Sequence, residues 1–172
     1  AASSFPEDTC LYHTTDTHWN DLGAYVGARA LLSELNIELP DPLSEDVTIS
    51  SQPDTPGDLS NMLNLGTLIE CGKNPVITGY PTHNMAVKAN TEERISCQAE
   101  AADERNLFVR RDSFCINMVP YLASQFNNTE IENHIYYNND MPRESNADIF
   151  VLEVVERNAL YEMSAFHYFS AL

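Results

Sequence analysis

A helical pattern of apolar and polar positions follows the segment "YHTTDTHWNDLGAY" (residues 12–25). From Leu22 to Leu35, apolar side chains recur three and four positions apart, which is the spacing of one helix face. Asn20 is a residue type that caps helix N-termini, and Asp21 complements the positive end of the helix dipole. The pattern predicts a helix from Asn20 to Leu35, ended by the prolines that follow.

The rest of the first half carries weaker patterns. Residues 10–14 ("CLYHT") alternate weakly and predict a short strand, and residues 46–50 ("DVTIS") predict another. The segment "TPGDLSNMLNLG" (55–66) predicts a short helix. From Ile69 to Ala102, glycine and proline are frequent, so we expect loop there with one or two short strands, around Val76 to Tyr80 and Ala86 to Ala89.

The second half has stronger patterns. Since proline is tolerated only in the first turn of a helix or at a kink, Pro120 means that the helix around it begins or bends near Met118. The predicted elements are "NLFVRR" (106–111) as a buried strand, "FCINMVPYLASQF" (114–126) as a helix, "EIENHIYY" (130–137) as a strand, "DIFVLEVVE" (148–156) as a central strand and "RNALYEMSAF" (157–166) as a helix.

Strands separated by helices are typical of an α/β fold with a parallel sheet and helices on its faces. The chain contains no internal repeat and no low-complexity linker. Its 172 residues, of which 43% are hydrophobic, suit one globular domain. We therefore expect residues 1–172 to form a single α/β domain.

The chain is strongly acidic, with 26 acidic and 9 basic side chains and a net charge of −17. This charge repels a nucleic acid backbone or an anionic membrane, so neither is expected as a partner. An acidic polysaccharide would need a local basic patch, for which Arg110, Arg111, Arg143 and Arg157 are the candidates. No run of 18 apolar residues occurs, and the first residues lack the features of a signal peptide, so we expect any export signal or anchor to lie outside this sequence.

The four cysteines form no C-x-x-C pair, which disfavours a structural zinc site. Cys71 and Cys97 bracket the segment that is rich in glycine and proline, where a crosslink would restrict a long loop. In an oxidising compartment a disulfide between these two residues is an open alternative.

Two groups of reactive side chains follow predicted strands. Asp16 and His18 come after residues 10–14, and Ser113 comes after residues 106–111. Because the carboxyl ends of parallel strands meet at one edge of a sheet, these side chains are expected to lie close together. A serine hydroxyl needs a neighbouring base, and the base needs a carboxylate that fixes its tautomer. The spacing thus predicts a catalytic triad of Ser113, His18 and Asp16.

Each of these residues also has a simpler interpretation. Ser113 taken alone suits the N-cap of a helix. Asp16 and His18 suit a metal site if His13 or His83 supplies a third ligand, although no second histidine lies one helical turn away. Trp19 suits either a core anchor or a wall of the cleft.

Five segments together resemble the alginate O-acetyltransferase family of SGNH-hydrolase-like proteins, which includes the D-x-H-W motif proteins. The resemblance spans Tyr12 to Arg157. Its hallmark is an Asp-x-His-Trp motif placed before the nucleophilic serine. The segments are "TDTHWNDLGAY", "GDLSNML", "LFVRRDSF", "PYLASQF" and "ADIFVLEVVER".

The resemblance implies an SGNH-type three-layer α/β/α fold with a mainly parallel sheet. It also implies a periplasmic or extracellular O-acetyltransferase that acetylates an exported, alginate-like polysaccharide through a serine acyl-enzyme. No cofactor or metal is implied, and a membrane-bound acyltransferase is the expected source of the acetyl group. Carbohydrate acetylesterase activity, or an inactive assembly subunit of the same fold, are alternatives.

Carried over residue by residue, the resemblance makes Ser113 the nucleophile, His18 the base and Asp16 its orienting carboxylate. The backbone N–H of Ser113 is one expected oxyanion donor. Arg111, Arg157 and Trp19 are the expected substrate contacts.

The sequence departs from the family pattern at two places. Arg111 stands where the wider superfamily has glycine before the Asp-Ser pair, so the turn cannot use the conformational freedom of glycine. Only eleven residues precede Tyr12, whereas family members carry further sheet there. We therefore expect residues 1–172 to lack N-terminal strands of the family domain. Either the sequence is the C-terminal part of a longer domain, or another chain completes the sheet.

Overall fold

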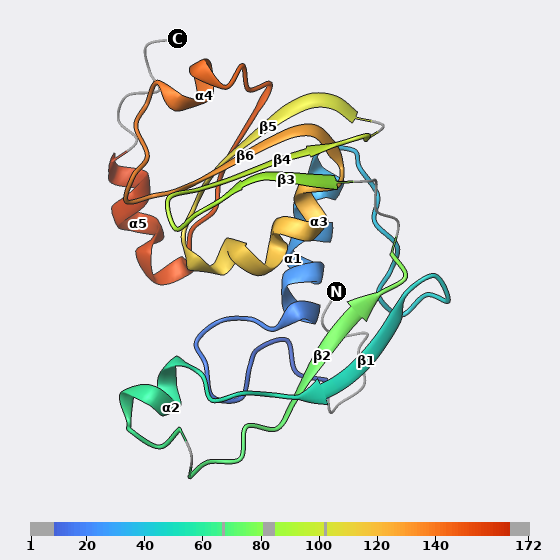
Figure 1. Cartoon of the computed structure of the whole chain (residues 1–172), viewed down its shortest axis with the longest axis vertical. Helices are drawn as coiled ribbons and strands as arrows, with labels where there is room; N and C mark the ends of the chain where they lie inside the picture. The colour runs from blue at the N-terminus through green and yellow to red at the C-terminus, as the bar shows by residue number, and fades with distance from the viewer. Residues whose placement is uncertain (1–8, 67, 81–84, 102, 166–172) are drawn as a thin grey trace.

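A computed structural model describes residues 9–66, 68–80, 85–101 and 103–165 of the chain (Figure 1). The elements are α1 (Asp21–Glu34), β1 (Thr48–Pro53), α2 (Asp58–Met62), β2 (Lys73–Thr78), β3 (Met85–Asn90), β4 (Arg94–Ala99), β5 (Asp103–Arg111), the 3₁₀ helix η2 (Ser113–Met118), α3 (Val119–Ala123), β6 (Phe126–Asn133), α4 (Met141–Glu144), β7 (Ile149–Leu152) and α5 (Glu156–Ala165). Among the described residues, no helix has the length and hydrophobicity needed to cross a bilayer.

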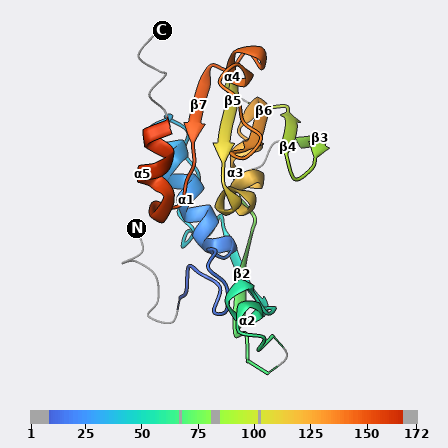
Figure 2. The same ribbon diagram turned by 90° about the vertical axis from the view of Figure 1, so that its left-hand side faces the viewer.

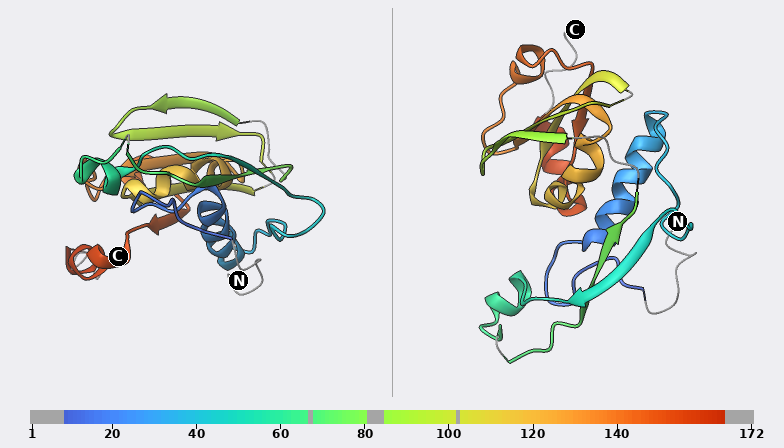
Figure 3. Two further views of the ribbon diagram at one scale, coloured as in Figure 1. Left: turned by 90° about the horizontal axis from the view of Figure 1, so that it is seen from below. Right: turned by 45° about the vertical axis from the view of Figure 1, so that its right-hand side comes forward.

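The main sheet has five strands in the order β3-β4-β6-β5-β7 (Figures 1 and 2). Strand β5 pairs in parallel with β6 and β7, whereas β4 pairs antiparallel with β3 and β6. The architecture is thus α/β, as predicted, but the sheet is mixed rather than mainly parallel. Strands β1 and β2 form a separate antiparallel pair, which lies with α2 away from the main sheet (Figure 3).

Three strand predictions were wrong in position. The strand expected over 130–137 is β6, which begins earlier and ends at Asn133. Residues 148–156 do not form a central strand: β7 has only four residues and, within the described part of the chain, pairs with β5 alone. Residues 10–14 contribute one isolated bridge, between Tyr12 and Trp19, rather than a strand. Their backbone is instead engaged by the following turn, since Asn20 N–H donates to the Leu11 carbonyl at 3.0 Å.

The segment expected to be mostly loop contains β2 and β3, which overlap the two short strands predicted there, and also the unexpected strand β4. In β4, the alternating residues Ile95, Cys97 and Ala99 are buried. This period of two is the mark of a half-buried strand, although polar residues occupy the other face. Cys97 lies within the hydrophobic core, and all four cysteines are free, so the alternative disulfide between Cys71 and Cys97 does not form.

The helices predicted over residues 20–35 and 157–166 are confirmed as α1 and α5. Helix α1 begins after Asn20, whose side chain accepts a hydrogen bond from the Gly23 N–H at 3.0 Å. The expected helix over 114–126 is divided into η2 and α3, with Pro120 in the first turn of α3, as the restricted geometry of proline requires. Phe126 already belongs to β6.

Strand β5 is covered on both faces. Leu107 and Val109 belong to the core cluster that also includes buried residues of α1 and α3, and α3 packs against β4 and β6. Arg110 alternates to the opposite face, where its guanidinium lies 2.6 Å from the Glu162 carboxylate of α5. Because β5 is enclosed in this way, the turn at its carboxyl end, where Ser113 lies, starts from a rigid support.

Candidate functional site

Asp16, His18 and Ser113 are joined by hydrogen bonds. His18 Nδ1 lies 2.6 Å from Asp16 Oδ1, and His18 Nε2 lies 2.8 Å from Ser113 Oγ. Ser113 is exposed, while the side chains of His18 and Asp16 retain 28% and 22% of their accessible surface. The three residues predicted from sequence therefore meet in a geometry in which the serine hydroxyl can donate its proton to imidazole.

A tight turn brings Asp16 and His18 together. The His13 N–H donates to the His18 carbonyl at 3.2 Å, and the His18 N–H donates to Asp16 Oδ1 at 2.9 Å. At the end of the turn, the Asn20 side chain is 1% exposed and donates to the Cys10 carbonyl at 2.8 Å. The carboxylate thus folds back over its own turn and reaches the imidazole two residues later.

The start of α2 completes the support of Asp16. The Asp58 N–H donates to Asp16 Oδ2 at 3.0 Å, and the Gly57 N–H donates to Thr15 Oγ1 at 3.0 Å. A Cβ atom at Gly57 would lie 2.4 Å from the Cβ of Asp16, so only glycine permits this approach. The Asp58 carboxylate accepts from the Thr17 N–H at 2.7 Å and from its hydroxyl.

Sequence reasoning did not assign a role to Gly57 or Asp58. The segment "GDLSNML" is part of the family resemblance, but nothing local shows that its first turn faces Asp16. Contact between residues about forty positions apart had to come from the structure.

The Asp16 carboxylate is held in its charged form. Burial alone would raise its pKa, but hydrogen bonds from the His18 and Asp58 backbones and from the His18 ring lower the pKa to about 2. The carboxylate is therefore ionised at neutral pH. In that form it fixes the proton on His18 Nδ1 and leaves Nε2 to accept from Ser113.

Trp19 ties the turn to the helix that carries the serine. Its indole N–H donates to the Phe114 carbonyl at 2.8 Å, and its own carbonyl accepts from the Asn117 side chain at 3.2 Å. The Trp19 and Phe114 rings also pack edge to face, with centroids 5.8 Å apart. Trp19 thus connects the turn before α1 to η2 and keeps His18 close to Ser113.

The two arginines expected to contact substrate lie in different environments. Arg111 is 4% exposed, and its guanidinium donates to the carbonyls of Glu92, at 3.0 Å, and Asp112, at 3.3 Å. It therefore supports the turn rather than facing the open side of the site. Arg157 is exposed, and its Cζ atom lies 5.6 Å from the centre of the Phe114 ring.

The ring of Phe114 in turn lies 4.5 Å from the His18 ring. Among the predicted substrate contacts, Arg157 and Trp19 thus both lie against the ring that packs on His18.

A metal site is a competing interpretation of the same turn. One oxygen of Asp16, one of Asp58 and a ring nitrogen of His18 lie within 4.8 Å of one another. The direct bond between Asp16 and His18 Nδ1 uses the atoms that would face a cation, so the arrangement fits a hydrogen-bonded pair better. His13 does not join the group, because its Nδ1 lies 3.0 Å from Asp54 Oδ2. His83 lies outside the described residues.

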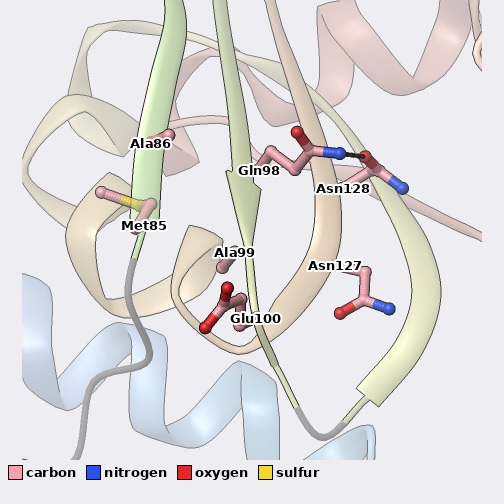
Figure 4. A pocket seen from close by; sticks show the side chains of 7 residues that line it. All are labelled: Met85, Ala86, Gln98, Ala99, Glu100, Asn127 and Asn128. Atoms are coloured by element: carbon pink, nitrogen blue, oxygen red, sulfur yellow. Dashed lines mark hydrogen bonds between the residues drawn. The ribbon is translucent and has the colours of Figure 1, made fainter.

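A polar hollow lies at the other end of the sheet (Figure 4). It is lined by the start of β3, the end of β4 and the start of β6, and Gln98 of β4 donates to Asn128 of β6 at 3.4 Å. Because β5 and β6 run in parallel, the start of β6 lies far from Ser113, which follows the carboxyl end of β5. This hollow is distinct from the site of the triad.

No family model matches the chain, and no curated protein sequence matches it. Among solved structures, it is similar to a DHHW family protein from Eubacterium siraeum DSM 15702, with a TM-score of 0.68 and 13% identity over 85% of this chain. It is also similar to PatB1 from Bacillus cereus, with a TM-score of 0.66 and 16% identity over 92% of this chain.

A structure of Bacillus cereus PatB1 with a sulfonyl adduct gives a TM-score of 0.62 and 17% identity over 86% of this chain. The present chain spans 59% of the DHHW family protein and 67% and 61% of the two PatB1 structures. The chain therefore has the α/β fold of these proteins, over less than the full length of each.

Asp16→Asn tests the charge state of the carboxylate. Because the folded-state pKa of Asp16, about 2, lies below its ordinary value of 3.8, the charge stabilises the folded state above pH ~4. That contribution is lost as the pH falls towards about 2. We expect the difference in free energy of unfolding between wild type and variant to shrink over this range, measured by urea unfolding at several pH values.

Asp140→Asn, which alters an exposed aspartate, is the control and should follow the pH dependence of wild type. A difference between wild type and Asp16→Asn that stays constant with pH would contradict the assignment.

Proposed function

We propose that this chain is an O-acetyltransferase that moves an acetyl group through Ser113 onto a hydroxyl of a polysaccharide. The observation that carries the proposal is the continuous hydrogen-bonded arrangement of Asp16, His18 and Ser113. The family resemblance of the sequence supports the same activity. The similarity of fold to PatB1 and to the DHHW family protein is consistent with it.

In the first half-reaction, Ser113 Oγ attacks the carbonyl carbon of an acetyl donor while His18 Nε2 takes the hydroxyl proton. The tetrahedral intermediate collapses when the bond to the leaving group breaks, and His18 returns the proton to that group. Asp16 stabilises the imidazolium that forms between these steps. The product is an acetyl ester on Ser113.

In the second half-reaction, a sugar hydroxyl attacks the ester carbonyl, and His18 takes its proton. The bond to Ser113 Oγ then breaks, and His18 returns the proton to the serine. Each transfer passes through an oxyanion. The backbone N–H of Ser113 stands at the start of η2, where helix N–H groups lack an intrahelical acceptor and can stabilise that charge.

A carbohydrate acetylesterase is the second candidate. The same acyl-enzyme is hydrolysed when water replaces the sugar hydroxyl, and the exposure of Ser113 admits water to the site. Binding of an acceptor sugar would have to exclude that water for transfer to dominate. An inactive assembly subunit is less well supported, because the three catalytic side chains keep their mutual hydrogen bonds.

The charges of the chain favour an acceptor without carboxylates. Of the four candidate arginines, Arg110 is buried against Glu162, and Arg111 is buried against backbone carbonyls. Arg143 and Arg157 are exposed. Two such cations within a chain of net charge −17 make a weak site for a polyuronate such as alginate. We therefore propose a neutral glycan as the acceptor.

The remaining aspects of the proposal rest on the family resemblance. They are export to the periplasm or the cell exterior, and delivery of the acetyl group by a membrane-bound acyltransferase. No cofactor takes part in the proposed chemistry.

Ser113→Ala tests the nucleophile. With a chromogenic acetyl ester, the variant should lose ~10³-fold or more of the wild-type rate, because it cannot form the acyl-enzyme. The Ser113 oxygen of wild type should attack the sulfur of a sulfonyl fluoride and release fluoride to solvent, while His18 takes the hydroxyl proton. The covalent sulfonyl adduct is detected as a mass increase of the intact protein. Ser50→Ala, at an exposed position of β1, is the control and should react like wild type. An unchanged rate or adduct in Ser113→Ala would refute the proposal.

The acceptor preference is tested with neutral and uronate oligosaccharides of equal length. With an activated acetyl ester as donor, we expect the neutral series to be acetylated ~10-fold or more faster at low salt, since the acidic protein repels uronates. Added salt should narrow this ratio by screening the repulsion. Mass spectrometry of the products gives the rates. Faster acetylation of the uronates, weakened by salt, would contradict a neutral acceptor.

A further inference from the structure

The residue before the nucleophile is fixed from two directions. Asp112 is 7% exposed and caps η2, since its Oδ1 atom accepts from the Phe114 N–H at 2.8 Å. Its Oδ2 atom accepts from the Val155 N–H at 2.7 Å. Its own N–H donates to Glu153 Oε2 at 3.1 Å. Two bonds thus run in opposite directions between the turn after β5 and the turn after β7.

We call these two hydrogen bonds, between Asp112 and residues Glu153 and Val155, the clamp. The clamp holds the turn in which the sequence lacks a glycine. Arg111 precedes Asp112, so the turn that presents Ser113 has no residue with the backbone freedom of glycine. The polypeptide between β7 and α5 holds the turn instead. We infer that Glu153 is a positioning residue that holds Asp112, and through it Ser113, in reach of His18.

The side chain of Glu153 lies among charged groups from several elements. It faces Asp112 directly, and a small cavity beside it is also lined by Arg110, His134 and Glu162. Arg110 is paired with Glu162, with 2.6 Å between their charged atoms.

Burial, the charge of Asp112 and a side-chain hydrogen bond with Asp112 raise the pKa of Glu153. The Asp112 N–H and the cation of Arg111 lower it, and the net pKa is about 8. Glu153 is therefore neutral near pH 7. A neutral carboxyl can accept from the Asp112 N–H through one oxygen and donate to the Asp112 carboxylate through the other.

Ionisation of Glu153 changes the clamp. Above about pH 8 the carboxylate of Glu153, which is partly exposed, faces the buried carboxylate of Asp112, and their repulsion separates the two turns. The raised folded-state pKa gives a stability contribution that is complete below the ordinary value of 4.5 and is lost as the pH rises through about 8. Displacement of Asp112 moves Ser113 away from His18, so reaction at Ser113 falls over the same range.

The experiment compares pH profiles of wild type, Glu153→Gln and Glu156→Gln. Glutamine keeps the shape, one acceptor and one donor of neutral Glu153 but cannot ionise. Glu156 is exposed at the start of α5 and serves as the matched control. The rate is that of acyl-enzyme formation from an activated acetyl ester with the full chain, corrected for the rate of Ser113→Ala.

The kinetic comparison rests on the proposed function. We expect wild type and Glu156→Gln to lose ~10-fold in rate per pH unit above pH ~8, whereas Glu153→Gln retains its rate. The same alkaline decline in Glu153→Gln would overturn the inference.

Thermal unfolding separates failure of the clamp from failure of the proposed function. Between pH ~6 and ~9, the melting temperature of wild type should fall more than that of Glu153→Gln, whether or not the protein transfers acyl groups. Equal falls in the two proteins would overturn the inference. Absence of acyl-enzyme in wild type, together with unequal falls, would refute the proposed function and leave the clamp in place.

Discussion

The hydrogen bond between the Asp16 carboxylate and His18 Nδ1 is the interaction on which the site depends. At 2.6 Å it fixes both the orientation of the imidazole and the nitrogen that carries its proton. The carboxylate can serve only because the backbone N–H groups of His18 and Asp58 keep it charged and in place. The close approach of Gly57 to Asp16 is part of the same constraint, since a larger residue would push α2 away from the turn.

The other half of the site depends on the sheet. Strand β5 lies between the parallel strands β6 and β7, so its carboxyl end is supported on both sides. Trp19 connects this end to the turn of Asp16 through its bond to the Phe114 carbonyl. The bonds of Asp112 connect it to the start of α5. Together these links hold Ser113 and His18, which lie 95 residues apart in sequence, within one hydrogen bond.

Much of the site could be predicted because its signals are local. The cap at Asn20, the effect of Pro120 and the Asp-x-His spacing all follow from short stretches of sequence. Asp16 and His18 do not follow a strand, however, and meet Ser113 because Trp19 ties their turn to η2. Strand β4 was missed because its polar face obscured the alternation of Ile95, Cys97 and Ala99. The edge position of β7 depends on strand pairing, and the burial of Arg111 depends on the Glu92 carbonyl in another turn. Such contacts are decided by tertiary packing and leave no local pattern.

The tautomer of His18 is the most direct test of this account. Nitrogen NMR of protein labelled in its histidine rings distinguishes a protonated Nδ1 from a protonated Nε2 in the neutral ring. The account predicts that His18 carries its proton on Nδ1, facing Asp16, and that its Nε2 signal changes in Ser113→Ala. The account is contradicted if the neutral His18 ring carries its proton on Nε2 and its Nε2 signal is the same in wild type and Ser113→Ala.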